Sequence, residues 1–74
     1  ALTISREIGD KNGESTDLFN LGAIYATIGE LDKAIACYGQ SLSIRRKLGN
    51  PYDIMQTESD LQRVKNQRDN DGRS

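Results

Sequence analysis

Residues 18–38 read LFNLGAIYATIGELDKAIACY, and this stretch decides the fold. Its small and apolar residues recur at intervals of three and four on both sides of Gly29-Glu30, which is the spacing of one buried stripe on an α-helix. The spacing predicts a helix over about residues 11–28 and a second over 31–48, packed as an antiparallel pair. The first stripe comprises Leu18, Leu21, Gly22, Tyr25 and Ile28, and the second comprises Leu31, Ala34, Ile35, Tyr38, Leu42, Ile44 and Leu48.

Turn residues mark where these helices begin and end. Gly9 is expected to stop a preceding helix, and Asp10 is expected to cap the next. Gly49 likewise stops the second helix, after which Asn50 caps a third helix and Pro51 takes its first position, where a missing N–H costs nothing. The third helix should run to about Arg68 and pack beside the first, while the polar residues 69–74 should form a disordered tail.

The end of the preceding helix and the end of the helix over 31–48 are near copies of each other. Residues 1–10, ALTISREIGD, align with residues 41–50, SLSIRRKLGN, at an offset of 40 residues. A fixed period of this length is typical of a stacked array of helical repeats. Residues 1–10 are therefore interpreted as the end of a preceding repeat, and residues 11–50 as one complete helical hairpin.

The composition of the chain excludes several classes of function. The chain has 74 residues, no histidine, one cysteine and a net charge of −1, so imidazole catalysis, Cys/His zinc sites and disulfide frameworks are excluded. The charge balance gives no attraction to nucleic acid or to an anionic membrane. The sequence also contains no run of about 18 apolar residues, which is the length needed to span a bilayer. We expect no enzyme activity, no cofactor, no metal, and a cytoplasmic location.

The motif Leu18-x-x-Leu21-Gly22-x-x-Tyr25, followed by Ala34-x-x-x-Tyr38, resembles the tetratricopeptide repeat signature, with Leu in place of its leading Trp and Tyr in place of its Phe. The resemblance implies an all-α hairpin solenoid in which Gly22 and Ala34 allow the two helices to approach closely. The family's usual Pro would fall at Arg46, and its absence lengthens the repeat beyond about 34 residues. The 40-residue unit looks like the long variety of kinesin light chains, Leu-Gly-Asn-rich adaptors and many bacterial signalling proteins.

The third helix is predicted to be a cap over residues 51–68. The 40-residue offset carries Leu21 and Ile24 onto Leu61 and Val64, so the docking face stays apolar. Together with Ile54, this face should pack on the preceding repeat. The face that would meet a further helix has become polar, which suits the end of a solenoid. Its residues are Glu58, Gln62 and Lys65.

The resemblance also places a concave, ligand-facing groove on the first helix of each pair. The predicted peptide-binding residues are Thr16, Phe19, Asn20, Ala23 and Thr27, followed forty residues later by Gln56, Asp60, Arg63 and Gln67. Asn20 matches a family position whose amide often hydrogen-bonds the main chain of a bound peptide, because it offers both donors and an acceptor. The alternative is an ordinary solvated asparagine.

Other candidate residues favour structural roles. Cys37 is interpreted as a small packing residue, and Arg45-Arg46-Lys47 as cations that stabilise a helix end rather than as an anion site. The expected function is a non-catalytic scaffold that binds a protein or extended peptide. The alternative is a purely structural cap or self-association module, and residues 1–8 are expected to join isolated chains into a homo-oligomer, most simply a dimer.

Overall fold

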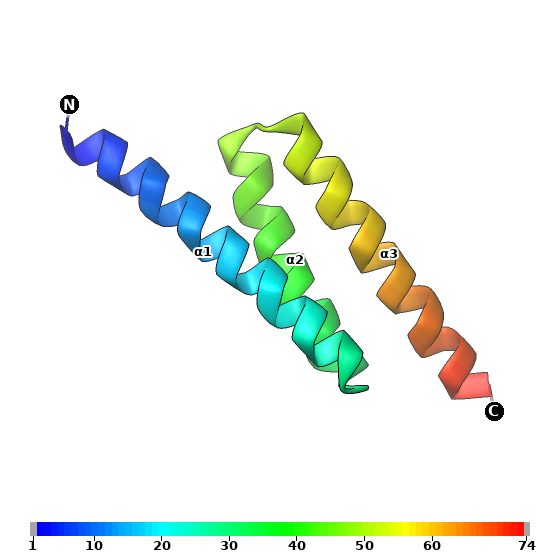
Figure 1. Ribbon diagram of the computed structural model, residues 1–74. Helices are drawn as coiled ribbons and strands as arrows, with labels where there is room; N and C mark the ends of the chain where they lie inside the picture. Colours follow the sequence, from blue (N-terminus) through cyan, green and yellow to red (C-terminus); the bar gives the residue numbers. More distant parts are fainter. Residues whose placement is uncertain (1, 74) are drawn as a thin grey trace.

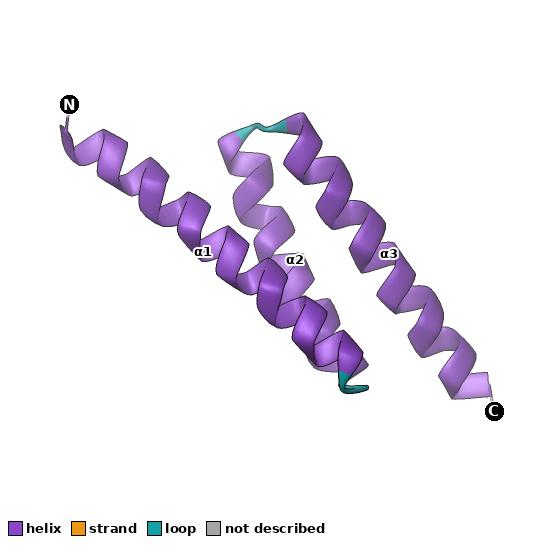
Figure 2. Ribbon diagram, in the orientation of Figure 1, coloured by secondary structure: helices purple, strands orange, loops and turns teal. Residues whose placement is uncertain are grey.

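The computed structural model describes the backbone of residues 2–73 and the side chains of residues 10–70. Three helices account for nearly all of it: α1 (Leu2–Thr27), α2 (Leu31–Leu48) and α3 (Pro51–Arg73) (Figures 1 and 2). No strand occurs among residues 2–73. The all-α prediction is confirmed, and α2 has the predicted bounds.

A short turn joins α1 to α2. Gly29 adopts φ 90°, a left-handed conformation that glycine accepts without a steric penalty. The Glu30 N–H donates to the Tyr25 carbonyl at 2.8 Å, which satisfies one of the free carbonyls at the end of α1. The chain can therefore reverse direction within three residues and bring α2 back along α1.

The turn between α2 and α3 has the predicted geometry. Gly49 is left-handed with φ 81°, and its N–H donates to the Arg45 carbonyl at 2.9 Å. The Asn50 side-chain oxygen accepts from the backbone N–H groups of Tyr52 and Asp53 at 3.1 and 3.3 Å. Gly49 is thus confirmed as the helix stop and Asn50 as the cap of α3.

Removing this cap should destabilise the fold measurably. We expect Asn50→Ala to lower the free energy of unfolding by about 1 kcal/mol, because two N–H groups of α3 lose their acceptor. Urea denaturation followed by circular dichroism measures the change. The control is Asn66→Ala, because Asn66 is exposed on α3 and its side chain only accepts a 3.2 Å hydrogen bond from Gln62. Equal stability of the two variants would contradict the capping role.

The core forms where α2 contacts both other helices. Figure 1 shows α1 crossing over α2 while α3 runs beside α2, and α2 is the element that both neighbours contact. The fully buried apolar cluster and the half-buried residues around it come from all three helices. The buried members are Leu31, Ala34, Tyr38 and Val64, and the surrounding members are Phe19, Ala23, Tyr25, Ala26, Ile35 and Leu61.

Gly22 lies against the ring of Tyr38. A Cβ atom placed on Gly22 would be 3.0 Å from two ring carbons of Tyr38, closer than ordinary van der Waals contact. Gly22 therefore permits the close approach of α1 and α2, as predicted. Its nearest neighbour is the Tyr38 ring, while Ala34, the expected small counterpart, is fully buried in the same cluster.

The predicted break at Gly9 and Asp10 is wrong for this structure, because α1 continues through both residues. The Gly9-Asp10 pair differs from the Gly49-Asn50 turn in the residue that follows it. Asn50 precedes Pro51, which disfavours helical conformation before it and removes an N–H donor, whereas Asp10 precedes Lys11. Gly9 alone costs a helix only about 1 kcal/mol. The division of the chain into repeats stays a prediction.

Two predictions about α3 are also wrong. Its helix extends to Arg73, so residues 69–73 are helical rather than a disordered tail, and Ser74 lies outside the described residues. The helix packs chiefly on α2 and only marginally meets α1. Its docking residues are as predicted, since Val64 is buried and Ile54 and Leu61 are half-buried.

The expected buried stripe of α1 is only partly buried. Gly22 is buried and Leu18 and Tyr25 are half-buried, but Leu21 and Ile28 are 43% and 64% exposed. Helical spacing predicts that these residues share a side of α1, but α2 covers a narrower strip than the stripe occupies. The stripe of α2 behaves differently, because neighbours on two sides bury Leu31, Ala34, Tyr38 and Leu42.

Candidate interaction site

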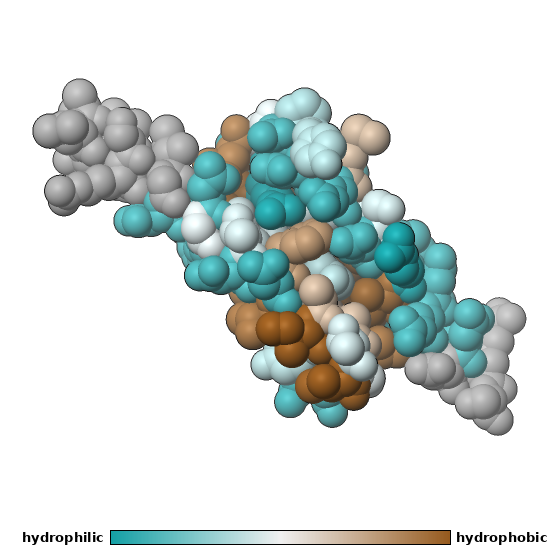
Figure 3. All heavy atoms as spheres, viewed as in Figure 1, coloured by the Kyte–Doolittle hydropathy of each residue, from teal (hydrophilic) through white to brown (hydrophobic). Residues whose placement is uncertain are grey.

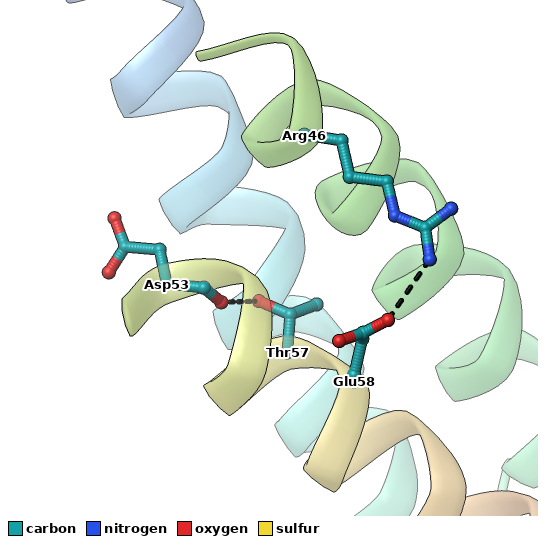
Figure 4. Close-up of polar contacts among 4 residues, drawn as sticks. All are labelled: Arg46, Asp53, Thr57 and Glu58. Atoms are coloured by element: carbon teal, nitrogen blue, oxygen red, sulfur yellow. Dashed lines mark hydrogen bonds and ion pairs between the residues drawn. The ribbon is translucent and has the colours of Figure 1, made fainter. Parts of the chain in front are cut away.

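A buried arginine lies where the three helices meet. The Arg45 side chain, at the end of α2, donates from a terminal guanidinium nitrogen to the Thr57 hydroxyl at 2.7 Å. Thr57 in turn donates to the Asp53 carbonyl at 2.8 Å, as Figure 4 shows. The guanidinium carbon lies 4.9 Å from the centre of the Phe19 ring, so α1 also contributes to its surroundings.

Two buried serines connect α1 to α2 near Arg45. The Ser41 hydroxyl donates to the Ser15 carbonyl at 2.8 Å, and the Ser15 hydroxyl donates to the Asn12 carbonyl at 2.8 Å. Both serines are fully buried. Small polar side chains that return hydrogen bonds to backbone carbonyls allow the helices to pack closely without leaving unpaired donors.

Sequence reasoning missed the role of Arg45, which was assigned to helix-end stabilisation and solvation. A signal was present, because Arg45 lies seven residues after Tyr38 and three after Leu42, on the buried stripe of α2. Arg46 and Lys47 are exposed as expected. Arg46 pairs with Glu58 across the α2–α3 junction at 3.0 Å (Figure 4). Because both side chains are exposed, this ion pair contributes little to the stability of the fold.

The predicted peptide-binding residues fall into two groups in the structure. Phe19, Ala23 and Asp60 are half-buried, and Phe19 and Ala23 pack against the core. The other predicted residues are exposed: Thr16, Asn20, Thr27, Gln56, Arg63 and Gln67. The Thr27 hydroxyl donates to the Ala23 carbonyl at 2.9 Å, so its donor is occupied within the helix.

Three of these residues influence Tyr38, one by contact and two by their charges. Phe19 of α1 meets the Tyr38 ring edge to face, with ring centres 5.3 Å apart. Burial raises the pKa of the Tyr38 hydroxyl, the negative charge of Asp60 raises it further, and Arg63 acts in the opposite direction. Phe19 of α1 thus contacts Tyr38 of α2, and the charges of Asp60 and Arg63 on α3 act on the hydroxyl of the same tyrosine.

The remaining chemistry of the described residues is limited. Cys37 is a half-buried free thiol. Among residues 10–70 no three His, Cys, Asp or Glu side chains form a group that could hold a metal ion. No helix within residues 2–73 has both the length and the apolar character required to cross a membrane.

Comparison with known proteins agrees with the motif and the helical hairpin. A family model described as "Tetratricopeptide repeat" matches residues 1–47, more than half of the chain. Neither a curated protein nor a solved structure matches the chain significantly. The matched residues contain the Leu-Leu-Gly-Tyr motif of α1, the Gly22–Tyr38 contact and most of α2. The chain therefore belongs to the tetratricopeptide repeat family.

Proposed function

We propose that this chain is a non-catalytic scaffold segment that binds an extended peptide or partner protein on the side where α1 and α3 flank Tyr38. Tetratricopeptide repeats typically bind proteins and are generally non-catalytic. The observation that carries the proposal is the packing of Phe19 on Tyr38, with the opposite charges of Asp60 and Arg63 on α3 acting on the Tyr38 hydroxyl. No partner class other than protein is proposed, since the net charge of −1 offers little attraction for polyanions.

The chemistry of this side suits a main chain with mixed charges. The exposed Asn20 amide has two donors and one acceptor for a peptide backbone. Asp60 and Arg63 offer opposite charges three residues apart on α3, which lets them bind both cationic and anionic side chains of one ligand. Thr16, Gln56 and Gln67 supply neutral polar groups at the edges, and Ala23 and Thr27 complete the proposed surface.

Two finer assignments belong to the same proposal. The 40-residue offset, and the continuation of α2 past Arg46 to Leu48, support the long-repeat variety of the family. A cytoplasmic location is supported by the single, free cysteine, because reducing compartments keep thiols unpaired.

The role of Asn20 can be tested with peptides selected from a random library on the immobilised chain. We expect Asn20→Ala to weaken binding by about 0.5–1.5 kcal/mol, the net contribution of a typical hydrogen bond, without changing helicity. Isothermal titration calorimetry measures the change. Gln62→Ala is the matched control, because Gln62 is an exposed amide on the predicted solvent face of α3. Equal losses in both variants would contradict a role for Asn20.

The second candidate function is a structural cap or self-association module. The exposed apolar side chains of α1 favour it, because Leu21, Ile24 and Ile28 are 43%, 56% and 64% exposed. Under this alternative, selected peptides would be insensitive to Asn20, Asp60 and Arg63, and light scattering would find a homo-oligomer of the chain. The residues 1–8 expected to form that interface lie outside the described side chains.

A further inference from the structure

Arg45 is a buried cation that has no carboxylate beside it among the described residues. It is 7% exposed and lies between Phe19 of α1 and Thr57 of α3. Phe19 contributes an aromatic ring and Thr57 a neutral hydroxyl, so neither neighbour carries a negative charge. The ion pairs among residues 10–70 are formed by other cations, namely Lys11, Lys33, Arg46 and Arg68. This part of the fold therefore encloses a positive charge without a counter-charge.

The hydrogen bonds of Arg45 leave one edge of its guanidinium group free. A guanidinium carries five N–H donors in one plane. The bond to Thr57 comes from Nη1, the terminal nitrogen on the same side as Cδ. Nε is buried without an acceptor, and no residue among 10–70 accepts from Nη2. Because Nε and Nη2 share the opposite edge, two adjacent donors are left without partners there.

The acids closest to Thr57 do not neutralise Arg45. Glu58 pairs with Arg46 at 3.0 Å, and the carboxylate of Asp53 points away from Thr57 (Figure 4). The backbone carbonyl of Asp53, rather than its carboxylate, accepts from the Thr57 hydroxyl at 2.8 Å. A buried charge is costly without a partner, so an anion that reached Arg45 would relieve that cost.

A carboxylate is the anion that fits the free edge. Its two oxygens lie side by side in one plane and can accept from Nε and Nη2 together, which is the bidentate arrangement that arginine forms with carboxylates. A phosphate group carries more negative charge, and α3 has three acids within about one turn of Thr57 that would repel it more strongly. These acids are Asp53, Glu58 and Asp60.

Phe19 connects Arg45 with the proposed peptide surface. The Phe19 ring packs on Tyr38 with ring centres 5.3 Å apart, and the guanidinium carbon of Arg45 lies 4.9 Å from the centre of the same ring. Figure 3 shows hydrophilic side chains over the end of α2 and the start of α3, whereas apolar side chains gather over the carboxyl-terminal half of α1. The surroundings of Arg45 are thus polar enough for a charged group to approach.

We propose that the Nε–Nη2 edge of Arg45 binds a carboxylate of the peptide that lies on the Tyr38 side. The carboxylate accepts from both nitrogens and supplies the missing counter-charge, while Thr57 keeps its bond to Nη1. Arg45 lies on α2, outside the predicted peptide-binding residues, which all lie on α1 and α3. The inference rests on the proposed function, because the carboxylate belongs to that peptide. An acidic side chain and a carboxyl terminus share this chemistry.

The test uses peptides selected from the random library on the 74-residue chain. Each acidic side chain of a peptide is replaced by its amide, one at a time, and the carboxyl terminus is amidated in a separate peptide. One of these changes is expected to weaken binding by about tenfold or more in calorimetry, because a charge-assisted contact is lost. The change that does so identifies the source of the carboxylate. If none of them weakens binding, the proposal is wrong.

The variant Arg45→Met assigns the effect to this residue. With the guanidinium removed, the unmodified and the neutralised peptide should bind equally well. Arg46→Met is the matched control, because Arg46 is exposed and already pairs with Glu58, so the tenfold difference should persist. A difference that persists in Arg45→Met, or that disappears in Arg46→Met, would contradict the assignment.

A measurement on the wild-type chain does not depend on how these variants fold. The Nε–H signal of Arg45 in a nuclear magnetic resonance spectrum should shift when the unmodified peptide binds. Sodium acetate, compared with sodium chloride at equal ionic strength, should shift the same signal without any peptide. If the library yields no peptide, the proposed function fails, and acetate still decides whether Arg45 binds a carboxylate. A signal that responds to neither probe would overturn the proposal.

Discussion

Replacing Gly22 by leucine is expected to lower the free energy of unfolding by about 1–3 kcal/mol. A Cβ atom at Gly22 would already lie 3.0 Å from two carbons of the Tyr38 ring, and leucine adds three further carbons at the same contact. Tyr38 is buried between helices and cannot move aside without disturbing Phe19 and the core cluster. Thermal and urea denaturation followed by circular dichroism measure the loss.

Alanine substitutions at two helical glycines provide the matched control. Gly22→Ala and Gly39→Ala gain the same helix propensity, up to about 1 kcal/mol. A Cβ at Gly39 would meet nothing within 4 Å, so Gly39→Ala should stabilise the chain while Gly22→Ala gains less or loses. If Gly22→Leu melts at the wild-type temperature, the packing of α1 on α2 through this glycine is wrong.

Replacing Thr57 by valine should produce the other large effect. Valine has nearly the same shape as threonine, but it cannot accept from the buried guanidinium of Arg45, which is only 7% exposed. Hydrogen bonds to charged groups contribute about 1.5–3 kcal/mol, and a buried charge that loses its acceptor costs at least as much. We therefore expect Thr57→Val to lower the free energy of unfolding by about 2–3 kcal/mol in urea denaturation.

A double-mutant cycle identifies the cause of that loss. Once Arg45→Met removes the buried charge, Thr57→Val should cost much less than it does in the wild-type chain. Thr27→Val is the control, because Thr27 is exposed and its hydroxyl donates only to the Ala23 carbonyl, so a change within about 0.5 kcal/mol is expected. A coupling energy near zero between Arg45 and Thr57 would show that the 2.7 Å contact does not stabilise the fold.

The sequence predicted best those features that depend on neighbouring residues. The bounds of α2, the left-handed Gly49 and the Asn50 cap all follow from signals within a few residues. The closeness of Gly22 to α2 was also predicted, because the family motif places glycine at this contact. For the proposed peptide-binding residues, the sequence could predict a shared helix face, while the effect of the Asp60 and Arg63 charges on the Tyr38 hydroxyl depends on how α3 lies against α2.

The sequence by itself determined α2 and its two flanking turns, at Gly29 and Gly49, and the polarity of most helix faces, because hydrophobic spacing and capping are local properties. It also predicted a break at Gly9 that α1 does not have. Only the tertiary structure decided which apolar faces are covered, since that depends on the strip each neighbour can reach. It buried Arg45 between Thr57 and Phe19, which lie on two other helices, and it left Ile24 exposed while Val64, its counterpart 40 residues later, is buried. These two residues lie on equivalent helix faces and differ in burial because α2 covers α3 at Val64 and leaves the outer face of α1 open.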